Sequence, residues 1–301
     1  MAFACPRCHT LLDEIDLVTI CCSQDRLAFH KVDGIWRFLL PERVEYYSRF
    51  IRDYETIRRS EGRGSADPEY YRTLPYHSTS DWRIRAASFN AFIDKVLRPI
   101  EKGRSAANIL DLGAGNSWLS NRLASRGHDL VAVDLTVNDF DGLGCYRFYE
   151  STFLSVQAEF DHLPFADRSA DIVLYNASLH YSSDYEKTLS ESLRLLDAGG
   201  KVVILDSPVY RDPSSGLNMV REREEQFVRQ YGFPSDNLKS ENFLTYKRMI
   251  DLGLKLGIIW RHIRPYYGFH WLTRPWLARI LGRREPAEFG FWIGSKANVH
   301  G

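Results

Sequence analysis

The stretch that decides the fold of this chain is Ile109-Leu110-Asp111-Leu112-Gly113-Ala114-Gly115-Asn116-Ser117-Trp118. An apolar run ends at Asp111, two glycines follow, and a helical pattern begins at Trp118. Gly113 and Gly115 allow a tight turn and a close approach of a ligand to the backbone, and the helix that follows presents free N–H groups. The stretch therefore predicts a strand, a ligand-binding loop and a helix.

The rest of the chain after residue 105 repeats this alternation. Apolar, strand-like runs are expected at 106–112, 129–135, 153–160, 170–177 and 201–209. Amphipathic, helical runs lie between or after them, at 118–126, 185–196, 217–231 and 241–256. Strands alternating with helices are typical of βαβ units around a parallel sheet.

Composition excludes several classes of protein. The chain has 301 residues, of which 44% are hydrophobic and 26% charged, so a disulfide-stapled peptide, a fibrous repeat or a long disordered chain is not expected. No apolar run approaches the roughly eighteen residues of a membrane span, and we expect a cytoplasmic protein. Lys plus Arg and Asp plus Glu both number 39, but the net charge is +2 over 1–104, −8 over 105–206 and +6 over 207–301. This excludes a uniformly basic nucleic-acid binder and leaves a local basic surface open.

The loop can be assigned to one of two ligand classes. The second expected strand ends in Asp134, where a carboxylate can accept both hydroxyls of a ribose. A dinucleotide fingerprint requires a third glycine where Trp118 stands, and Asp111 would repel its pyrophosphate. S-adenosylmethionine has no phosphate and carries an ammonium and a sulfonium, which a carboxylate attracts. The loop therefore favours S-adenosylmethionine.

Four segments resemble class I S-adenosylmethionine-dependent methyltransferases of the type 11 group. ILDLGAGNSWLS at 109–120 resembles their first motif, and VAVDL at 131–135 resembles the strand end that binds the ribose. The stretch at 157–181, QAEFDHLPFADRSADIVLYNASLHY, is similar to their third and fourth motifs. LRLLDAGGKVVILDSP at 193–208 looks like the helix, turn and strand that follow.

The resemblance covers about residues 105–210 and implies an α/β, Rossmann-like fold with a seven-stranded, mostly parallel sheet whose last strand is antiparallel. The last two strands are then expected at 257–263 and 288–294. The implied cofactor is S-adenosyl-L-methionine. The positions that match the family's cofactor-binding motifs are Asp111, Gly113, Gly115, Asn116, Asp134, Leu135, Glu159, Phe160 and Asn176.

Acceptor chemistry is expected at the carboxyl ends of the fourth and fifth strands, which carry Asn176, His180, Tyr181 and Asp206. His180 is the candidate general base because only its unperturbed pKa lies near neutrality. The alternative that His180 only caps or packs a helix stays open. The stretch after the fourth strand lacks the Asn-Pro-Pro-aromatic turn of enzymes that methylate exocyclic amines, which argues against that class of acceptor.

The amino terminus holds four of the five cysteines and resembles a small zinc ribbon that precedes some methyltransferases. Adjacent Cys21 and Cys22 should point apart in an extended chain, so the candidate zinc ligands are Cys5, Cys8 and Cys22 with Asp25 or His9. Either a bound zinc or a degenerate ribbon held by packing fits this pattern. We expect a ribbon-like domain at 1–42, connecting helices at 43–104 and the methyltransferase domain at 105–301.

The acceptor itself is left open by the sequence. A small molecule, methylated on O, N or C, is the favoured acceptor, and an rRNA or tRNA base held by the ribbon and the carboxyl-terminal segment is the alternative. A non-catalytic, protein-binding role is a third possibility. Between Asp251 and Glu285 there are seven basic residues, six interleaved Trp, Tyr and Phe residues, and no acidic residue. That segment could contact an anionic substrate, RNA or a membrane interface.

Overall fold

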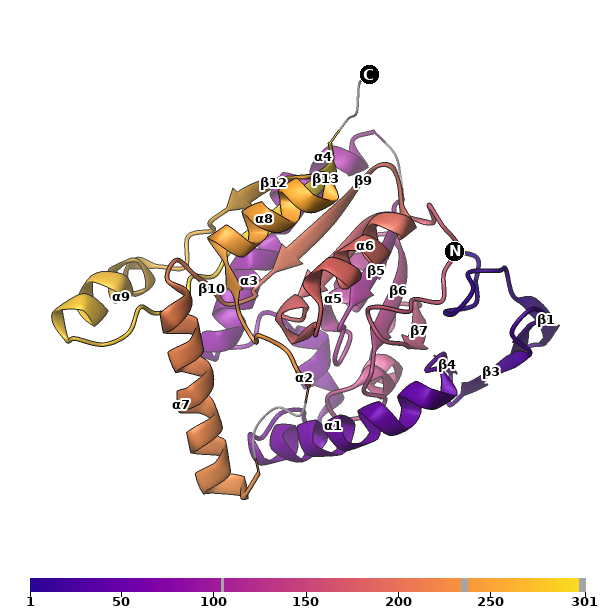
Figure 1. Cartoon of the computed structure of the whole chain (residues 1–301), viewed down its shortest axis with the longest axis horizontal. Helices are drawn as coiled ribbons and strands as arrows, with labels where there is room; N and C mark the ends of the chain where they lie inside the picture. The colour runs from indigo at the N-terminus through magenta and orange to yellow at the C-terminus, as the bar shows by residue number, and fades with distance from the viewer. Residues whose placement is uncertain (104–105, 234–237, 298–301) are drawn as a thin grey trace.

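The computed structural model describes residues 1–103, 106–233 and 238–297. Its centre is a seven-stranded part of a sheet, in the order β7-β6-β5-β8-β9-β13-β12 (Figure 1). The first five of these strands in chain order are parallel, whereas β13 runs antiparallel to both β9 and β12. The strand bounds are β5 Asn108–Leu112, β6 Asp129–Asp134, β7 Leu154–Gln157, β8 Ala170–Asn176, β9 Leu196–Leu205, β12 Ile258–Ile263 and β13 Phe291–Lys296. The predicted Rossmann-like fold with an antiparallel last strand is confirmed.

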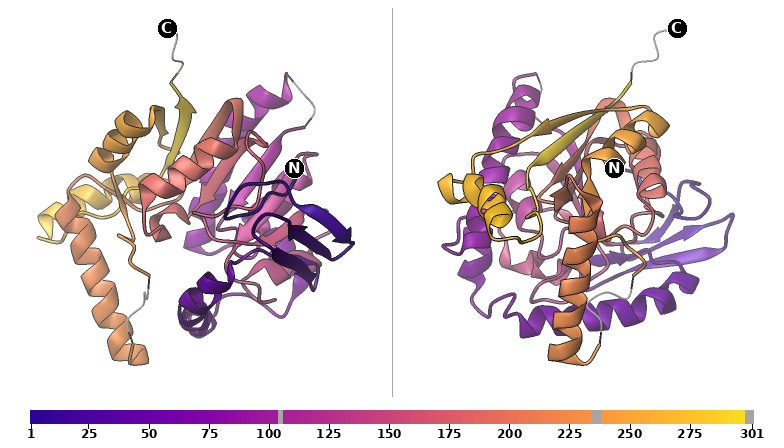
Figure 2. Two further views of the ribbon diagram at one scale, coloured as in Figure 1. Left: turned by 45° about the vertical axis from the view of Figure 1, so that its right-hand side comes forward. Right: turned by 60° about the vertical axis from the view of Figure 1, so that its left-hand side comes forward.

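The sheet is larger than predicted because the amino-terminal strands extend it. These are β1 (Asp13–Asp16), β2 (Thr19–Cys22), β3 (Leu27–Val32) and β4 (Ile35–Arg37). The seven predicted strands of the methyltransferase domain are present, and β4 pairs in parallel with β7, so the sheet of the described residues has eleven strands in all. An edge strand such as β7 would otherwise expose unpaired backbone groups, which β4 covers. The ribbon-like segment is therefore joined to the central sheet, at one end of the molecule in Figure 2.

Aromatic side chains consolidate this junction. Phe3 packs against Trp36, Phe38 and Phe165, with ring centroids 4.9 to 5.9 Å apart. The backbone N–H of Ala4 also donates to the carbonyl of Pro164 over 3.1 Å. The proposed boundary near residue 42 follows β4 and falls at the start of α1, and the boundary at 104 and 105 lies outside the described residues.

Helices cover both faces of the sheet because the buried strands are apolar on both sides. On one face α3 (Ser80–Phe92) and α5 (Trp118–Ala124) pack on residues such as Ile109 and Leu174. On the other, α6 (Tyr185–Leu195) and α8 (Tyr246–Leu256) pack on the alternate residues, such as Leu110 and Tyr175. Helix α8 begins five residues later than expected, where the Thr245 hydroxyl accepts the Arg248 N–H.

The remaining helices lie around the edges of this core. They are α1 (Pro41–Ser60), α2 (Pro68–Thr73), the π-helical η1 (Ile93–Leu97), α4 (Arg98–Glu101), the 3₁₀ turns η2 (Leu143–Phe148) and η3 (Leu179–Tyr181), α7 (Pro213–Tyr231) and α9 (Phe269–Ile280). The short strands β10 (Val209–Tyr210) and β11 (Leu244–Thr245) form a separate parallel pair. In Figure 1, α7 and α9 lie at the side of the molecule opposite β1 to β4. Within the described residues, every helix is too short or too polar to cross a bilayer.

Candidate functional site

The glycine loop after β5 is shaped by close contacts. Gly113 has a φ of +75°, and a Cβ atom placed there would lie 2.3 Å from the Cβ of Ser178. The N–H groups of Gly113 and Ala114 both donate to the carbonyl of Val133, which ties the loop to β6. Gly113 is therefore required both by its backbone angle and by the space around it.

Asp111 lies beneath this loop and is fully buried. One carboxylate oxygen accepts the Ser120 hydroxyl over 2.7 Å, and the other has no hydrogen-bond partner among the described residues. Burial, helped by the nearby Asp134, raises the pKa of Asp111 to about 7. The structure thus places Asp111 behind the loop, where it supports α5, instead of on a cavity wall where it would contact a cation directly.

Asp134, at the end of β6, lies on the opposite side of the loop and lines a cavity. One of its oxygens accepts the Gly115 N–H over 2.8 Å, and the other accepts the backbone N–H and the hydroxyl of Thr136. These bonds fix the carboxylate at the mouth of the loop. Leu135 follows it on the same cavity wall.

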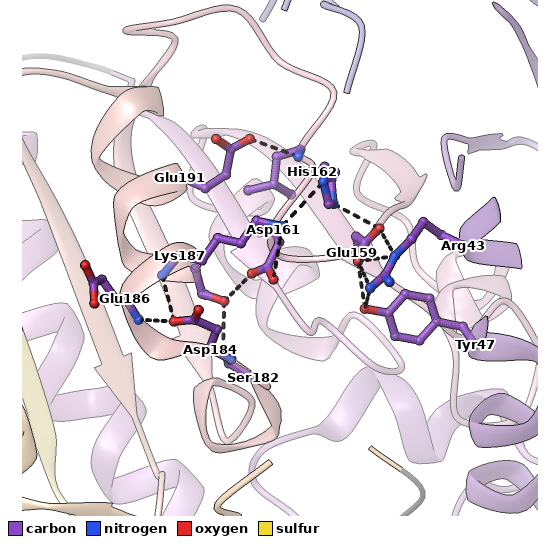
Figure 3. Close-up of polar contacts among 12 residues, drawn as sticks. Arg43, Tyr47, Glu159, Asp161, His162, Ser182, Asp184, Glu186, Lys187 and Glu191 are labelled. Atoms are coloured by element: carbon purple, nitrogen blue, oxygen red, sulfur yellow. Dashed lines mark hydrogen bonds and ion pairs between the residues drawn. The ribbon is translucent and has the colours of Figure 1, made fainter. Parts of the chain in front are cut away.

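Glu159, which follows β7, is bound by helix α1 (Figure 3). Arg43 donates to both of its carboxylate oxygens, over 2.7 to 3.1 Å, and the Tyr47 hydroxyl donates over 2.7 Å. His162 Nδ1 lies 3.1 Å from the same carboxylate. Burial alone would raise the pKa of Glu159, but the contacts with His162, Arg43 and Tyr47 lower it to about 2. Glu159 is 3% exposed and already surrounded by donors, so its main contact is with α1.

Two adjoining cavities open at the carboxyl edge of the sheet. The smaller one, of about 110 Å³, is lined by Asp134, Leu135, Glu159 and Phe160 together with Tyr47 of α1. The larger one has about 380 Å³. Both are lined by the glycine loop and by four further residues, which are Phe50, Tyr54, Ala177 and Tyr181. Helix α1 therefore forms a wall common to the two cavities.

Arginines in the larger cavity were missed by the sequence analysis. Arg58 of α1 pairs with Asp141 over 2.5 Å. Arg85 of α3 lies over the Trp82 ring at 4.8 Å, and makes no ion pair with the carboxylates that the structure describes. Burial lowers the pKa of Arg85 from its ordinary value, opposed by the charge of Asp206. Both arginines lie among many other charged and aromatic residues of the expected connecting helices at 43–104, and helical spacing alone does not distinguish them from their neighbours.

The residues present fit S-adenosylmethionine. The loop at Gly113 has no room for a side chain, so only backbone lines the cavity there. Leu135 and Phe160 give the smaller cavity an apolar wall beside the Asp134 carboxylate, which suits a purine and a ribose. Asn176 is half-buried, and its buried amide oxygen, which has no hydrogen-bond partner among the described residues, can accept from an ammonium in the larger cavity. Arg85 offers a guanidinium to a carboxylate there.

Comparison with known proteins agrees with this geometry. Residues 110–204 match the family model described as a methyltransferase domain. Residues 110–204 therefore form a methyltransferase domain, built on the mostly parallel part of the sheet. An uncharacterized methyltransferase of Mycobacterium tuberculosis is 32% identical over 164 residues, which are 54% of this chain and 57% of that protein. Malonyl-[acyl-carrier protein] O-methyltransferase 1 of Coxiella burnetii is 33% identical over 110 residues, or 36% of each chain.

The chain thus spans between about a third and just over half of the length of these curated relatives. Among solved structures, a 1,6-didemethyltoxoflavin-N1-methyltransferase from Burkholderia thailandensis is 15% identical, with a TM-score of 0.48. That alignment covers 95% of this chain and 99% of the other.

His180 and Asp206 are two of the titratable groups that line the larger cavity. Burial and the charge of Arg223 lower the pKa of His180 to about 3, and its Nδ1 lies 3.3 Å from the Ser207 hydroxyl. Burial raises the pKa of Asp206 to about 6, while the Ser88 hydroxyl donates to it over 2.5 Å. Both groups change protonation at a pH far from their ordinary values, as groups in active sites often do.

The cysteines ahead of the methyltransferase domain converge as predicted. The Sγ atoms of Cys5, Cys8 and Cys22 and a carboxylate oxygen of Asp25 all lie within 4.8 Å of one another. Cys8 and Cys22 are 3.5 Å apart, and Cys5 donates to Asp25 over 3.2 Å. Three sulfurs and one oxygen can form a tetrahedral zinc site. Asp25 and His9 were the two candidates for the fourth ligand, and it is Asp25 that lies beside the three thiols.

Proposed function

We propose that this protein transfers a methyl group from S-adenosylmethionine to a small molecule bound in the larger cavity. The observation that carries the proposal is the pair of cavities that meet at Gly113 and Gly115. A donor that extends across the glycine loop would have its adenosine in the smaller cavity and its reactive end facing the larger one. The volume of about 380 Å³ falls in the range of small-molecule sites.

The smaller cavity would hold the adenosine of the donor. Asp134 is fixed by Gly115 and Thr136 and lines this cavity, so its carboxylate would accept from a ribose hydroxyl. Phe160 and Leu135 would pack against the purine. Glu159 would act mainly by holding Arg43 and Tyr47, and hence α1, across the site.

The methionine end would meet the larger cavity. Asn176, with its free amide oxygen, would accept from the ammonium, and Arg85 would pair with the carboxylate. S-adenosylmethionine supplies an electrophilic methyl carbon bonded to sulfur. The protein's part would be to align the acceptor with that carbon and to exclude water, and residues of α1 and α7 line the larger cavity where this would occur.

An acceptor oxygen or nitrogen that carries a proton must lose it, and two side chains can receive it. His180, the base proposed from the sequence, is neutral at pH 7, but a pKa of about 3 makes it a weak acceptor. Asp206, with a pKa of about 6, is better matched to neutral pH. We therefore add Asp206 to His180 as a candidate proton acceptor.

The proposal is tested by two measurements on the full chain. Calorimetry should show binding of S-adenosylhomocysteine, and incubation with labelled S-adenosylmethionine and a fractionated cell extract should label the small-molecule fraction. RNA in place of a small molecule would appear as label in nucleic acid, with retention that weakens steeply as salt rises. Absence of cofactor binding would overturn both enzymatic readings and leave the protein-binding role.

We also propose that the ribbon-like segment holds zinc through Cys5, Cys8, Cys22 and Asp25. The convergence of these four ligand atoms supports it. The role would be structural, because four protein ligands leave no open position for a substrate. Elemental analysis of the purified protein should find about one zinc per chain, and a metal-free protein would show that the segment is held by packing alone.

A further inference from the structure

Helix α9 carries an apolar stripe that faces away from the protein. Phe269, Leu272, Trp276 and Ile280 are spaced by three, four and four residues, which places them on one side of a helix. Their exposed fractions are 74%, 62%, 65% and 61%, and no residue of α9 is buried. Large apolar side chains grouped in this way mark an interaction surface more often than single exposed residues do.

The opposite side of α9 is already used for attachment to the methyltransferase domain. Trp271 packs on Tyr267 and Phe289, with ring centroids 5.7 and 5.5 Å apart. The Tyr267 hydroxyl in turn lies 2.8 Å from that of Ser88 on α3. The orientation of the helix is therefore fixed, and its apolar stripe is directed outward by these contacts. In Figures 1 and 2, α9 projects from the side of the molecule.

Positive charge lies at the carboxyl end of the stripe. From residue 252 to residue 284 there are seven basic residues and no acidic one, and three of the seven, Lys255, Arg264 and Arg284, pair with carboxylates from other segments. Arg279 and Arg283, at the end of the helix, make no ion pair with the carboxylates that the structure describes. A partner with anionic groups beside an apolar layer would satisfy both features.

We propose that α9 lies in the headgroup region of a membrane that contains anionic lipid, with its apolar stripe inserted. A helix that projects, exposes Trp, Phe, Leu and Ile on one face and is flanked by arginines has the chemistry of an interfacial anchor. Phe289, which packs on α9, also lines the larger cavity, so the anchor would bring that cavity close to the lipid surface. Membrane binding in this form does not depend on the proposed catalysis.

The test is sedimentation of the full chain with vesicles of equimolar phosphatidylcholine and phosphatidylglycerol. The wild type should bind them, and the double substitution Leu272→Ser with Trp276→Ser should lower the partition coefficient by about tenfold or more, because interfacial binding scales with buried apolar area. Leu254→Ser is the matched control, since Leu254 is 81% exposed on α8 and outside the stripe. Arg279→Gln with Arg283→Gln should weaken binding to these vesicles and not to pure phosphatidylcholine.

Three results would overturn the proposal. They are failure of the wild type to bind, equal binding by the double variant, and a wild-type dimer in light scattering that the double variant converts to monomer without vesicle binding. The last result would assign the stripe to a second copy of the chain. Retention of the wild-type melting temperature and of S-adenosylhomocysteine affinity in the double variant separates loss of the surface from loss of the fold.

Discussion

The contact between Glu159 and helix α1 can be tested by Glu159→Gln. A pKa lowered from the ordinary 4.5 to about 2 corresponds to about 3 kcal/mol of stabilisation of the folded state, and the side chain is almost fully buried. Glutamine keeps the shape and removes the charge that Arg43 and Tyr47 contact. We expect the variant to lose about 1–3 kcal/mol of unfolding free energy at pH 7, because Arg43 is partly solvated and recovers some hydration.

The lowered pKa of Glu159 predicts how the stability difference between wild type and variant changes with pH. Because the folded-state pKa is lowered, the stabilisation is complete above the unfolded pKa of about 4.5 and is lost as pH falls toward about 2. The difference between wild type and variant in urea unfolding should therefore shrink to less than about half at pH 3. Affinity for S-adenosylhomocysteine should fall as well, since α1 lines both cavities.

Glu186→Gln is the control for this experiment. Glu186 pairs with Lys255 over 2.6 Å, but both side chains are exposed, so its loss should cost less than about 1 kcal/mol. A Glu159 variant as stable as this control at pH 7, or a stability difference that does not change between pH 7 and pH 3, would refute the assigned role of the carboxylate.

Three further predictions follow from the site. Gly113→Ala should weaken S-adenosylhomocysteine binding by about 1–3 kcal/mol, because the new Cβ atom clashes with the Ser178 side chain. Gly127→Ala is the control, since Gly127 also has a positive φ but faces open space, and calorimetry should show unchanged binding for it. Cys22→Ser should lower the zinc content and Cys21→Ser should leave it unchanged, and equal zinc in both variants would exclude the proposed ligand set. Once the acceptor is identified, wild-type turnover should fall as the pH drops below about 6, because Asp206 gains a proton there. Asp206→Asn should lower turnover and remove this fall at low pH. A pH profile of the variant identical to that of the wild type would exclude Asp206 as the proton acceptor.

Much of the site was predictable because it is local in sequence. The loop from Asp111 to Trp118 combines a strand end, two glycines and a helix start within ten residues, and Asp134 ends the neighbouring strand. Parallel strands bring such ends to one edge, so the periodicity alone placed Asp134 beside the loop. The zinc site itself stays a prediction, but its four candidate ligands do lie together in the structure, and Cys22 could be preferred over Cys21 because successive side chains of an extended strand point to opposite faces.

The sequence by itself determined the alternation of strands and helices in the methyltransferase domain, its glycine loop and the nature of its cofactor, since each is indicated by patterns within a few residues. Only the tertiary structure decided which charges meet. Arg43 and Glu159 are 116 residues apart, and Arg85 reaches the larger cavity only because α3 packs beside β9. The outward face of α9 was also decided by packing, since contacts with Tyr267 and Phe289 leave its apolar stripe in solvent. Contacts between distant segments depend on how helices and strands pack together, and the local pattern of apolar residues predicts each helix or strand but not its packing partners.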